Sequence, residues 1–485
     1  MIPLKPLTLL TGPPARGKTF ILNAIFNELL PADLELVAAC LLGTGKVGPG
    51  EVEIGDALSS LQKTGVVEVN VELDEVSPDT SSGGPLLRLR ELRLCVSPAN
   101  LKRALSGCLK GQLLPGDSEF RLTLGRSNYG LLDLFSETLE AALKSNSFER
   151  ESGGRYCLSI RGIGKPIPAE EELENIRKLA GMMEETFPEL ASQISKAALL
   201  AEILRAGEKV EEIAAFMSRL QGVLSHIERR LRVYGLLRPV YAWTGRGLLS
   251  LMVLEGMLDP DSVGAALLAP LLPAFGFTRA LARGASMLDT PELPDSARLL
   301  LELSSPVIVH PLHRGSGGKL YLDLNGTAVP VRMAHGSALS LASLILAAAP
   351  LLKAGGGVVL VDEVEHMLHP SSQAIAALLL LAMAGAGLTV VASTHSTAVA
   401  TVIARLSQAR SEEEARCLAA RLYKRLGFRA PSGEALGLAA RGARRGSAVY
   451  VVDGGHARLS QRPLEWIDRL SDTWAELGSW AASEC

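Results

Sequence analysis

The sequence predicts an α/β fold, with a mixed, largely parallel sheet, an antiparallel β subdomain near the N-terminus and a helical insertion. Three observations predict it. Apolar residues at 7–11 have strand character and lead through a glycine-rich turn into a helical pattern. A second apolar run, at 355–361, ends in two carboxylates. A third, at 388–393, follows after a helical stretch, which is the layout of a βαβ unit.

Length and composition set the frame. At 485 residues the chain is too long for one compact domain, so we expect two or three units. Its hydrophobic content of 47% suffices for a buried core, and its net charge of -3 gives no global attraction to nucleic acid. The cysteines include no C-x-x-C pair, which argues against a zinc site or a disulfide framework and favours a reducing cytoplasm. They are Cys40, Cys95, Cys108, Cys157, Cys417 and Cys485.

Two segments, 333–352 and 374–393, are apolar and long enough to span a bilayer. Both adjoin candidate site residues, and glycines at 385 and 387 divide the second into a helix and a strand. We therefore interpret both as buried elements of the α/β core. Because the first strand is predicted to begin at residue 7, we also expect no signal peptide. We expect a cytoplasmic protein without membrane insertion.

A phosphate-binding loop is predicted by the spacing G-x-x-x-x-G-K-T at residues 12–19. Backbone N–H groups at a helix start favour phosphate oxygens, and glycine tolerates the backbone angles of a tight wrap. Lys18 would reach the β- and γ-phosphates, and the Thr19 hydroxyl would ligate Mg²⁺. A chance glycine-rich turn is the alternative, and the flanking strand and helix argue against it. The candidate nucleotide-binding residues here are Gly12, Pro13, Pro14, Ala15, Arg16, Gly17, Lys18, Thr19 and Phe20.

Residues 1–165 are expected to form the N-terminal half of the core together with the antiparallel lobe. Clean apolar–polar alternation at 66–73 and 86–96, the latter with a one-residue shift at Glu91, predicts strands with one wet face. Further strands are expected at 34–42, 120–124 and 156–160. The turn-forming segment 79–85 connects two of them.

A helical insertion is expected over residues 166–305. Apolar residues recur at alternating spacings of three and four from 173 to 204 and again from 210 to 231, with a glycine break at 207. This pattern predicts a helical hairpin zipped into a short antiparallel coiled coil. Two helices of an ordinary bundle would give the same rhythm. Residues 235–306 are helical in character and interrupted by prolines.

Residues 306–460 are expected to form the C-terminal half of the core, followed by a helical tail at 461–485. Predicted elements are a strand at 307–309, a hairpin of 319–324 and 328–333 around Asn325-Gly326, a helix at 336–352 and a hairpin at 449–459. Residues 416–445 carry eight basic side chains and one acid. They could bind nucleic-acid phosphates or form a solvated helix face that balances the preceding glutamates; scarce aromatic residues favour the second interpretation.

The strand at 355–361 delivers Asp362 and Glu363 to the carboxyl edge of a parallel sheet, where ligands bind. There Asp362 can hold Mg²⁺ through water, and Glu363 can polarise the water that attacks a γ-phosphate. His395, at the end of the adjacent strand, can contact the γ-phosphate or orient that water. A solvated acidic turn and a structural histidine are the alternatives, which the loop at 12–19 makes weaker.

Together, residues 12–19, 358–363, the sequence Glu365-His366-Met367-Leu368-His369-Pro370 and Ser393-Thr394-His395-Ser396 resemble the core of ABC-type ATPases. The likeness is to their soluble branch, the structural-maintenance-of-chromosomes, RecF and OLD-like proteins, which are solitary AAA-family P-loop NTPases. It covers roughly residues 1–160 and 300–455 in layout.

The resemblance implies ATP and Mg²⁺ as cofactors, with Thr19 and Asp362 at the metal and Glu363 and His395 as catalytic residues. It also implies a signature loop that caps the γ-phosphate of a partner subunit. The matching stretch contains Gly336 and Ser337, but the usual serine two residues before that glycine is absent.

The function implied is an ATP-binding, Mg²⁺-dependent ATPase of ABC/SMC-like type that forms a homodimer in the ATP state and acts on DNA or a protein partner. Two alternatives remain open: a nucleotide-dependent scaffold with little hydrolysis, and the nucleotide-binding subunit of a transporter.

Overall fold

The computed structural model describes a defined part of the chain. Its described residues are 4–12, 16–29, 65–76, 86–113, 131–161, 167–168, 210–233, 239–244, 246–255, 272–308, 312–314, 319–324, 327–453 and 456–459. The expected strands at 34–42 and 120–124, the turn at 79–85, the first helical arm at 173–204 and the tail at 461–485 lie outside them.

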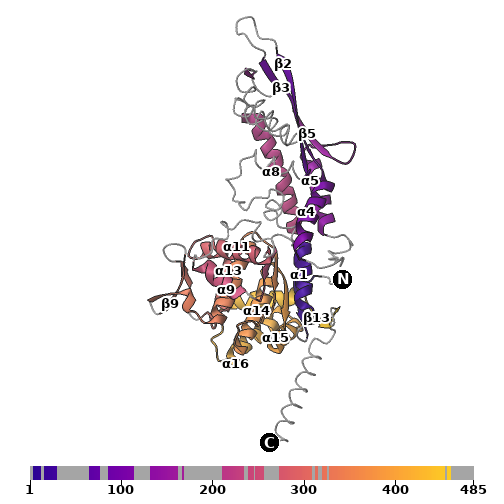
Figure 1. Cartoon of the computed structure of the whole chain (residues 1–485). Coiled ribbons are helices and arrows are strands. Elements are labelled where there is room, and N and C mark those ends of the chain that lie inside the picture. Colours follow the sequence, from indigo (N-terminus) through magenta and orange to yellow (C-terminus); the bar gives the residue numbers. More distant parts are fainter. Residues whose placement is uncertain are drawn as a thin grey trace. The chain divides into compact units, whose positions relative to one another are not determined.

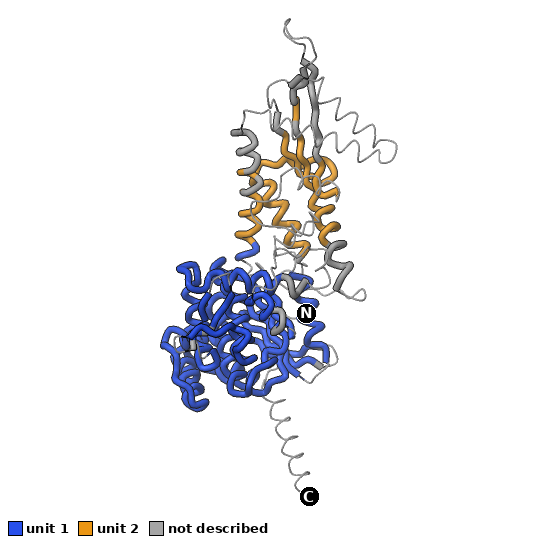
Figure 2. Tube along the Cα trace, turned by 60° about the vertical axis from the view of Figure 1, so that its left-hand side comes forward, with its two compact units in different colours: residues 1–34, 112–131, 231–485 blue, residues 35–111, 132–230 orange. Residues whose placement is uncertain are grey.

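The chain divides into two compact units (Figure 2). Unit 1 contains residues 1–34, 112–131 and 231–485, and unit 2 contains residues 35–111 and 132–230. This division differs from the expected boundaries at 165 and 305. The antiparallel lobe groups with the second helical arm in unit 2, while residues 231–305 belong to the core in unit 1 because they contribute one of its strands.

The described residues of unit 1 form a six-stranded sheet in which neighbouring strands are parallel, except that β13 and β14 are antiparallel. The expected α/β fold with a mixed, largely parallel sheet is confirmed. In spatial order the strands are β14 (His456–Leu459), β13 (Ser447–Asp453), β1 (Leu7–Thr11), β12 (Thr389–Thr394), β11 (Val358–Val361) and β7 (Val240–Ala242).

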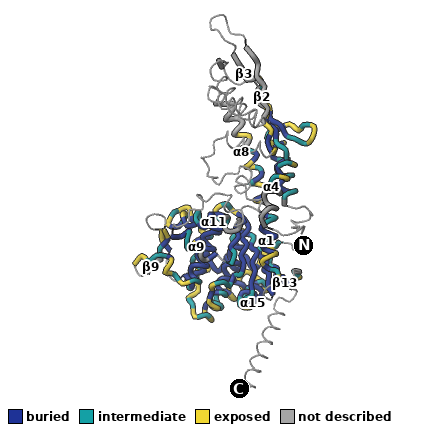
Figure 3. Tube along the Cα trace, viewed as in Figure 1, coloured by how far each residue is buried: buried dark blue, intermediate teal, exposed yellow. Residues whose placement is uncertain are grey.

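Both faces of this sheet are buried, which explains why its strands lack apolar–polar alternation. Leu9, Val361 and Ala392 belong to a large apolar cluster with α13 (Gly336–Lys353) and α14 (Pro370–Gly385). On the other face, α1 (Lys18–Leu29) packs Phe26 against Tyr241, with ring centroids 5.4 Å apart. In Figure 3 the dark blue interior of unit 1 contains the sheet and the helix faces that pack on its two sides.

Further helices in the described part of unit 1 pack around α13 and α14, with α16 in contact with α15 and α17 (Figure 1). They are α9 (Arg246–Leu254), α11 (Leu272–Met287), α12 (Asp295–Leu303), α15 (Thr397–Ser407), α16 (Glu412–Arg425) and α17 (Gly433–Arg445). The interpretation of both long apolar segments as core elements is confirmed. Among the described residues α13 alone is long and apolar enough to cross a membrane, and 83% of this helix is buried inside the protein. A cytoplasmic location stays a prediction.

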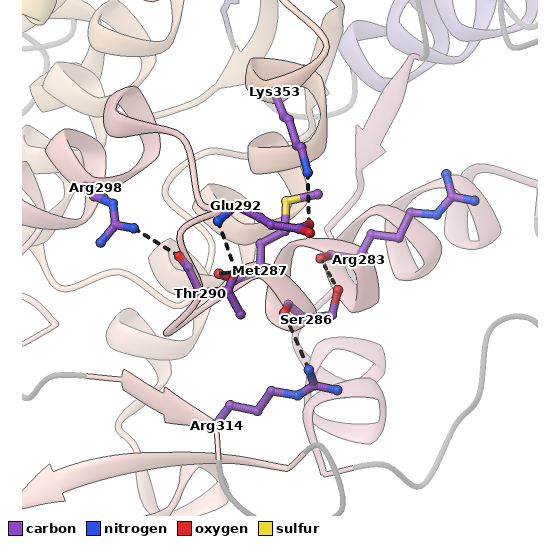
Figure 4. A network of polar contacts seen from close by, with 8 residues as sticks. All are labelled: Arg283, Ser286, Met287, Thr290, Glu292, Arg298, Arg314 and Lys353. Carbon is purple, nitrogen blue, oxygen red and sulfur yellow. Dashed lines mark hydrogen bonds and ion pairs between the residues drawn. The ribbon is translucent and has the colours of Figure 1, made fainter.

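A polar network closes the turn between α11 and α12 at the surface of unit 1 (Figure 4). The Thr290 hydroxyl donates to the Met287 carbonyl at 2.7 Å and accepts the Glu292 N–H at 3.2 Å. Lys353, at the end of α13, pairs with the Glu292 carboxylate at 2.9 Å.

Nearby, β8 (Leu312–Arg314), β9 (Leu320–Leu324) and β10 (Thr327–Pro330) form a small antiparallel sheet, so the predicted hairpin is confirmed. A 3₁₀ turn, Val331–Met333, follows it.

Unit 2 contains the antiparallel sheet that alternation predicted. Among the described residues of unit 2, the strands are β2 (Val67–Val76), β3 (Leu86–Val96), β4 (Glu149–Arg150), β5 (Tyr156–Arg161) and β6 (Ile167–Pro168). The helices described there are α4 (Pro98–Leu113), α5 (Leu131–Ser145) and most of α8 (Val210–Val233). The register of β2 on β3 shifts where Glu72 pairs with Glu91 and Leu73 with Leu89, so the predicted shift at Glu91 is a β-bulge. Helix α8 confirms that the second arm is helical, and the coiled-coil pairing with the first arm stays a prediction.

Three sequence expectations need correction. Cys95 and Cys157 form a disulfide, because β3 and β5 pair these two residues directly although they are 62 positions apart. The cysteines therefore no longer argue for a reducing cytoplasm. Residues 307–308 form no strand: the Val307 and Ile308 N–H groups donate to the Ser304 carbonyl in a turn that follows α12. Strand β7 lies within residues 235–306, which the sequence predicts to be helical.

Candidate nucleotide-binding site

The site lies at one edge of the six-stranded sheet in unit 1. Strands β1, β12, β11 and β7 are mutually parallel, so their carboxyl ends meet there. Each strand is followed at that edge by a polar or glycine-rich segment. These segments begin at Gly12 after β1, at Asp362 after β11, at His395 after β12 and at Trp243 after β7.

The phosphate loop has the backbone that its glycines predicted. Gly12 has a φ of +135° and Gly17 a φ of +95°, and both values favour glycine. A Cβ on Gly12 would lie 2.5 Å from the Val452 carbonyl oxygen, so this position also lets β13 approach closely. Helix α1 begins directly after Gly17. Pro13, Pro14 and Ala15 lie outside the described residues, while Arg16, Thr19 and Phe20 are exposed.

Lys18 and His395 meet at the loop although 377 positions separate them. The Lys18 residue is 4% exposed, and its ammonium donates to the Gly12 carbonyl at 2.9 Å. His395 Nδ1 lies 3.2 Å from Lys18 Nζ and 3.1 Å from the same carbonyl oxygen. Burial lowers the pKa of Lys18, and the nearby carboxylates of Glu365, Asp362 and Glu363 oppose that shift. The lysine therefore points into a site already lined by negative charge.

The Asp362 carboxylate accepts hydrogen bonds from hydroxyl groups of three segments: the start of α1, the end of β12 and the turn after β7. Its carboxylate accepts from Thr19 at 3.0 and 3.1 Å, from Thr244 at 3.1 Å and from Ser393 at 2.6 Å. The Asp362 residue is only 2% exposed. Carboxylate and hydroxyl oxygens are the ligands that Mg²⁺ prefers, so this donor set fits the metal expected at Thr19 and Asp362.

Glu363 follows in a left-handed turn with a φ of +47°. For a residue with a side chain, this conformation costs roughly 1–2 kcal/mol and persists only where the surroundings hold it. The Glu363 N–H donates to the Ser393 hydroxyl at 2.8 Å, and its carbonyl accepts from the His366 N–H at 2.9 Å. The tight turn therefore holds the expected catalytic carboxylate at the end of β11.

Glu365 fixes the end of the neighbouring strand. Its carboxylate accepts from the Thr394 hydroxyl at 2.6 Å and from the His395 N–H. Because Glu365 belongs to the turn after β11, it links the main chain at His395 to the segment that carries Asp362 and Glu363. Glu365 is part of the sequence motif, but the motif alone indicates no role for it. Its contacts with Thr394 and His395 indicate that it holds the end of β12.

Gly336 and Ser337 lie elsewhere, at the start of α13. The Ser337 hydroxyl donates to the Met367 carbonyl at 3.0 Å and accepts the His369 N–H at 3.2 Å, and the residue is 7% exposed. A Cβ on Gly336 would lie 3.0 Å from the Met367 side chain. Within the described part of the chain, the structure therefore brings these two residues to the turn after Glu363 rather than to Lys18 and Thr19.

The sequence interpretation missed Thr244 and Arg246, which follow the unexpected strand β7. Thr244 donates to Asp362, and the Arg246 guanidinium donates to the Asp362 main-chain carbonyl at 2.9 Å. The available signal was Val240-Tyr241-Ala242, a run with β-propensity after Pro239 that ends in a threonine–glycine turn. Three residues were too few to distinguish it from the surrounding helices.

In a comparison with known protein families, one family model matches part of the chain. The model described as "AAA domain, putative AbiEii toxin, Type IV TA system" matches residues 279–401. That match contains Asp362, Glu363 and His395, whereas the phosphate loop lies before it and is joined to them by the geometry above. No curated protein matches the chain. The family match and the assembled site together support a P-loop NTPase fold of the AAA type for the core of this chain.

Proposed function

We propose that this chain binds ATP with Mg²⁺, hydrolyses it and couples the cycle to closure of a homodimer that acts on DNA or a protein partner. The observation that carries the proposal is the convergence of Lys18 and Thr19 with Asp362 and His395 at one sheet edge. Four strand ends contribute to it, and the arrangement matches the needs of a triphosphate: backbone N–H groups, a buried ammonium and oxygen ligands.

Each residue then has a distinct task. Lys18 leaves the Gly12 carbonyl to bind phosphate oxygens. Thr19 and Asp362 would hold Mg²⁺, which would supply positive charge against the β- and γ-phosphates. Glu363 accepts a proton from the attacking water, and His395 contacts the γ-phosphate or orients that water. Ser393 and Thr244 keep the Asp362 carboxylate oriented through their hydroxyl groups.

Exposed apolar side chains support the homodimer. Phe20, directly after the phosphate loop, is 49% exposed, and Met333 and Met367, beside Gly336, are 71% and 50% exposed. The two segments that would face each other across a nucleotide therefore both carry apolar surface. For the partner, the basic segment gives less support for DNA: Arg416 lies 4.0 Å from Glu413 and Arg441 3.8 Å from Glu412, as in a solvated helix face.

The test is ATP turnover by the full chain and by Glu363→Gln. The variant should lose turnover by about 10²-fold or more while it keeps ATP affinity, and it should accumulate an ATP-bound dimer in light scattering. Glu413→Gln, an exposed carboxylate in the first turn of α16, is the matched control. Turnover by Glu363→Gln at the wild-type rate would show that Glu363 is not the catalytic carboxylate.

One observation favours the scaffold alternative. The Ser337 hydroxyl, which would have to reach the nucleotide of a partner subunit, is engaged within its own chain by Met367 and His369. If these contacts persist in the ATP state, hydrolysis would be slow because the site lacks a γ-phosphate contact. Measuring ATP binding and turnover in one preparation distinguishes the two: tight binding by the wild type with no turnover above the rate of ATP hydrolysis without protein indicates the scaffold.

A further inference from the structure

Arg246 is a buried cation beneath the turn that carries the two site carboxylates. It is the first residue of α9 and follows β7, the strand next to β11. The residue is 2% exposed, which places it among the largest fully buried side chains of the described chain. Neither the family match at 279–401 nor the motifs of the sequence include it.

The guanidinium of Arg246 contacts main-chain carbonyls from two segments and one helix hydroxyl. Nη1 donates to the Asp362 carbonyl at 2.9 Å and to the Trp243 carbonyl at 3.2 Å. Nη2 donates to the Ser340 hydroxyl at 3.3 Å and lies 3.5 Å from the Glu363 carbonyl. One side chain therefore joins β7, the turn after β11 and the first turns of α13.

Each of these acceptors is neutral, so no direct ion pair offsets the desolvation penalty of the buried charge. Burial lowers the pKa of Arg246 to about 10, although Asp362, Glu365 and Glu363 oppose the shift through space. The side chain is still charged at neutral pH. An apolar side chain could fill the same volume without this desolvation penalty. What the guanidinium adds is a rigid set of donors in fixed directions.

The Arg246 N–H groups contact the main chain at the left-handed turn of Glu363, where the backbone is strained. The left-handed turn at Glu363 is held at its N–H by Ser393. Arg246 holds the same turn at the carbonyls of Asp362 and Glu363. Ser340 lies one helical turn after Gly336, so the guanidinium also touches the helix that begins with the signature-like segment.

We propose that Arg246 is a positioning residue: it holds the Asp362–Glu363 turn in the conformation that aims the Glu363 carboxylate, and it ties that turn to α13. The inference rests on the proposed ATPase function and assigns to it a residue that touches no substrate. Loss of the guanidinium should allow the turn to relax, which would impair hydrolysis more than nucleotide binding.

The experiment compares full-length wild type, Arg246→Met and Arg246→Lys in three measurements: ATP affinity in EDTA, kcat at saturating Mg²⁺ and ATP, and amide hydrogen exchange of residues 362–368. We expect Arg246→Met to keep ATP affinity within about 3-fold and to lose kcat by about 10²-fold, as for a small misplacement of a catalytic group. Exchange in 362–368 should accelerate, because His366 N–H donates to the Glu363 carbonyl. Arg246→Lys should restore part of both properties.

Arg445→Met is the matched control, since its guanidinium also donates to a main-chain carbonyl, that of Ala384, at 3.1 Å. It should leave all three measurements unchanged. Wild-type kcat and exchange in Arg246→Met would overturn the proposal, as would equal losses of affinity and kcat, which indicate a general structural defect. If the wild type itself does not hydrolyse ATP, the proposed function fails while exchange still reports whether Arg246 holds the turn.

Should Arg246→Met not fold, Ser340→Ala and Arg246→Lys carry the test. Ser340→Ala keeps the buried charge and removes only the contact to α13, so a fall in kcat of about 5-fold is expected, the equivalent of one hydrogen bond. Reduced kcat at unchanged affinity in either variant supports the proposal, and wild-type kcat in both overturns it.

Discussion

Ser393 connects Asp362 and Glu363, and removal of its hydroxyl should lower the stability of the protein. The residue has no exposed surface. Its hydroxyl donates to the Asp362 carboxylate at 2.6 Å and accepts the Glu363 N–H at 2.8 Å. Ser393→Ala would therefore remove both partners at once, at the point where the backbone adopts a left-handed turn.

The expected destabilisation follows from these two contacts. A hydrogen bond to a charged group contributes about 1.5–3 kcal/mol, and a fully buried N–H left without a partner costs about 1–3 kcal/mol. Glu363 is half-buried, so the second figure is an upper bound for its N–H. Asp362 retains donors from Thr19 and Thr244, which limits the first contribution. We expect Ser393→Ala to lower the free energy of unfolding by roughly 2–4 kcal/mol.

Urea unfolding followed by circular dichroism measures this loss, with Ser343→Ala as the matched control. Ser343 is equally buried, but its hydroxyl donates to the Ser340 carbonyl within α13, where alanine is a better helix former. The control should change stability by less than about 1 kcal/mol. Equal effects of the two substitutions would refute the inference that Ser393 holds the Asp362–Glu363 turn.

Two further predictions concern the loop and the metal position. Gly12→Ala should destabilise the protein by about 2 kcal/mol or more beyond the effect of Gly427→Ala. Both glycines have a positive φ, but of the two only Gly12 would place a Cβ 2.5 Å from the Val452 carbonyl oxygen. Melting temperatures of the two variants test this prediction, and equal shifts would contradict it. Thr244→Val should weaken the apparent Mg²⁺ affinity of ATP binding by about 10-fold, because Asp362 loses an orienting hydroxyl; an unchanged Mg²⁺ titration would remove Thr244 from the site.

Local patterns were sufficient to predict the parts of the site that lie on well-marked strands. The glycines at 12 and 17, the apolar strand before Asp362 and the strand before His395 each have a signal in adjacent residues, and parallel pairing then brings them to one edge. The prediction that β11 and β12 are neighbours is confirmed for the same reason: one helix, α14, connects them in a βαβ unit.

Features that depend on pairing between distant segments could not be predicted. Strand β7 has only three residues, so its pairing with β11 rather than its own pattern defines it, and Thr244 and Arg246 were missed with it. The same limit applies to the Cys95–Cys157 disulfide, which depends on the register of β3 against β5. The unit boundary near residue 231 also follows from β7, since that strand places residues 231–305 in the core.

The most direct test of the account is the Mg²⁺ dependence of ATP affinity in Asp362→Asn, measured by calorimetry with Mg²⁺ and with EDTA. Asp362 is 343 positions from Thr19, yet their side chains are in hydrogen-bond contact. The variant should keep the ATP affinity of the wild type in EDTA and lose most of the gain that Mg²⁺ provides, whereas Lys18→Met should lose affinity in both conditions. A full Mg²⁺-dependent gain in Asp362→Asn would contradict the assignment of the two segments to one nucleotide site.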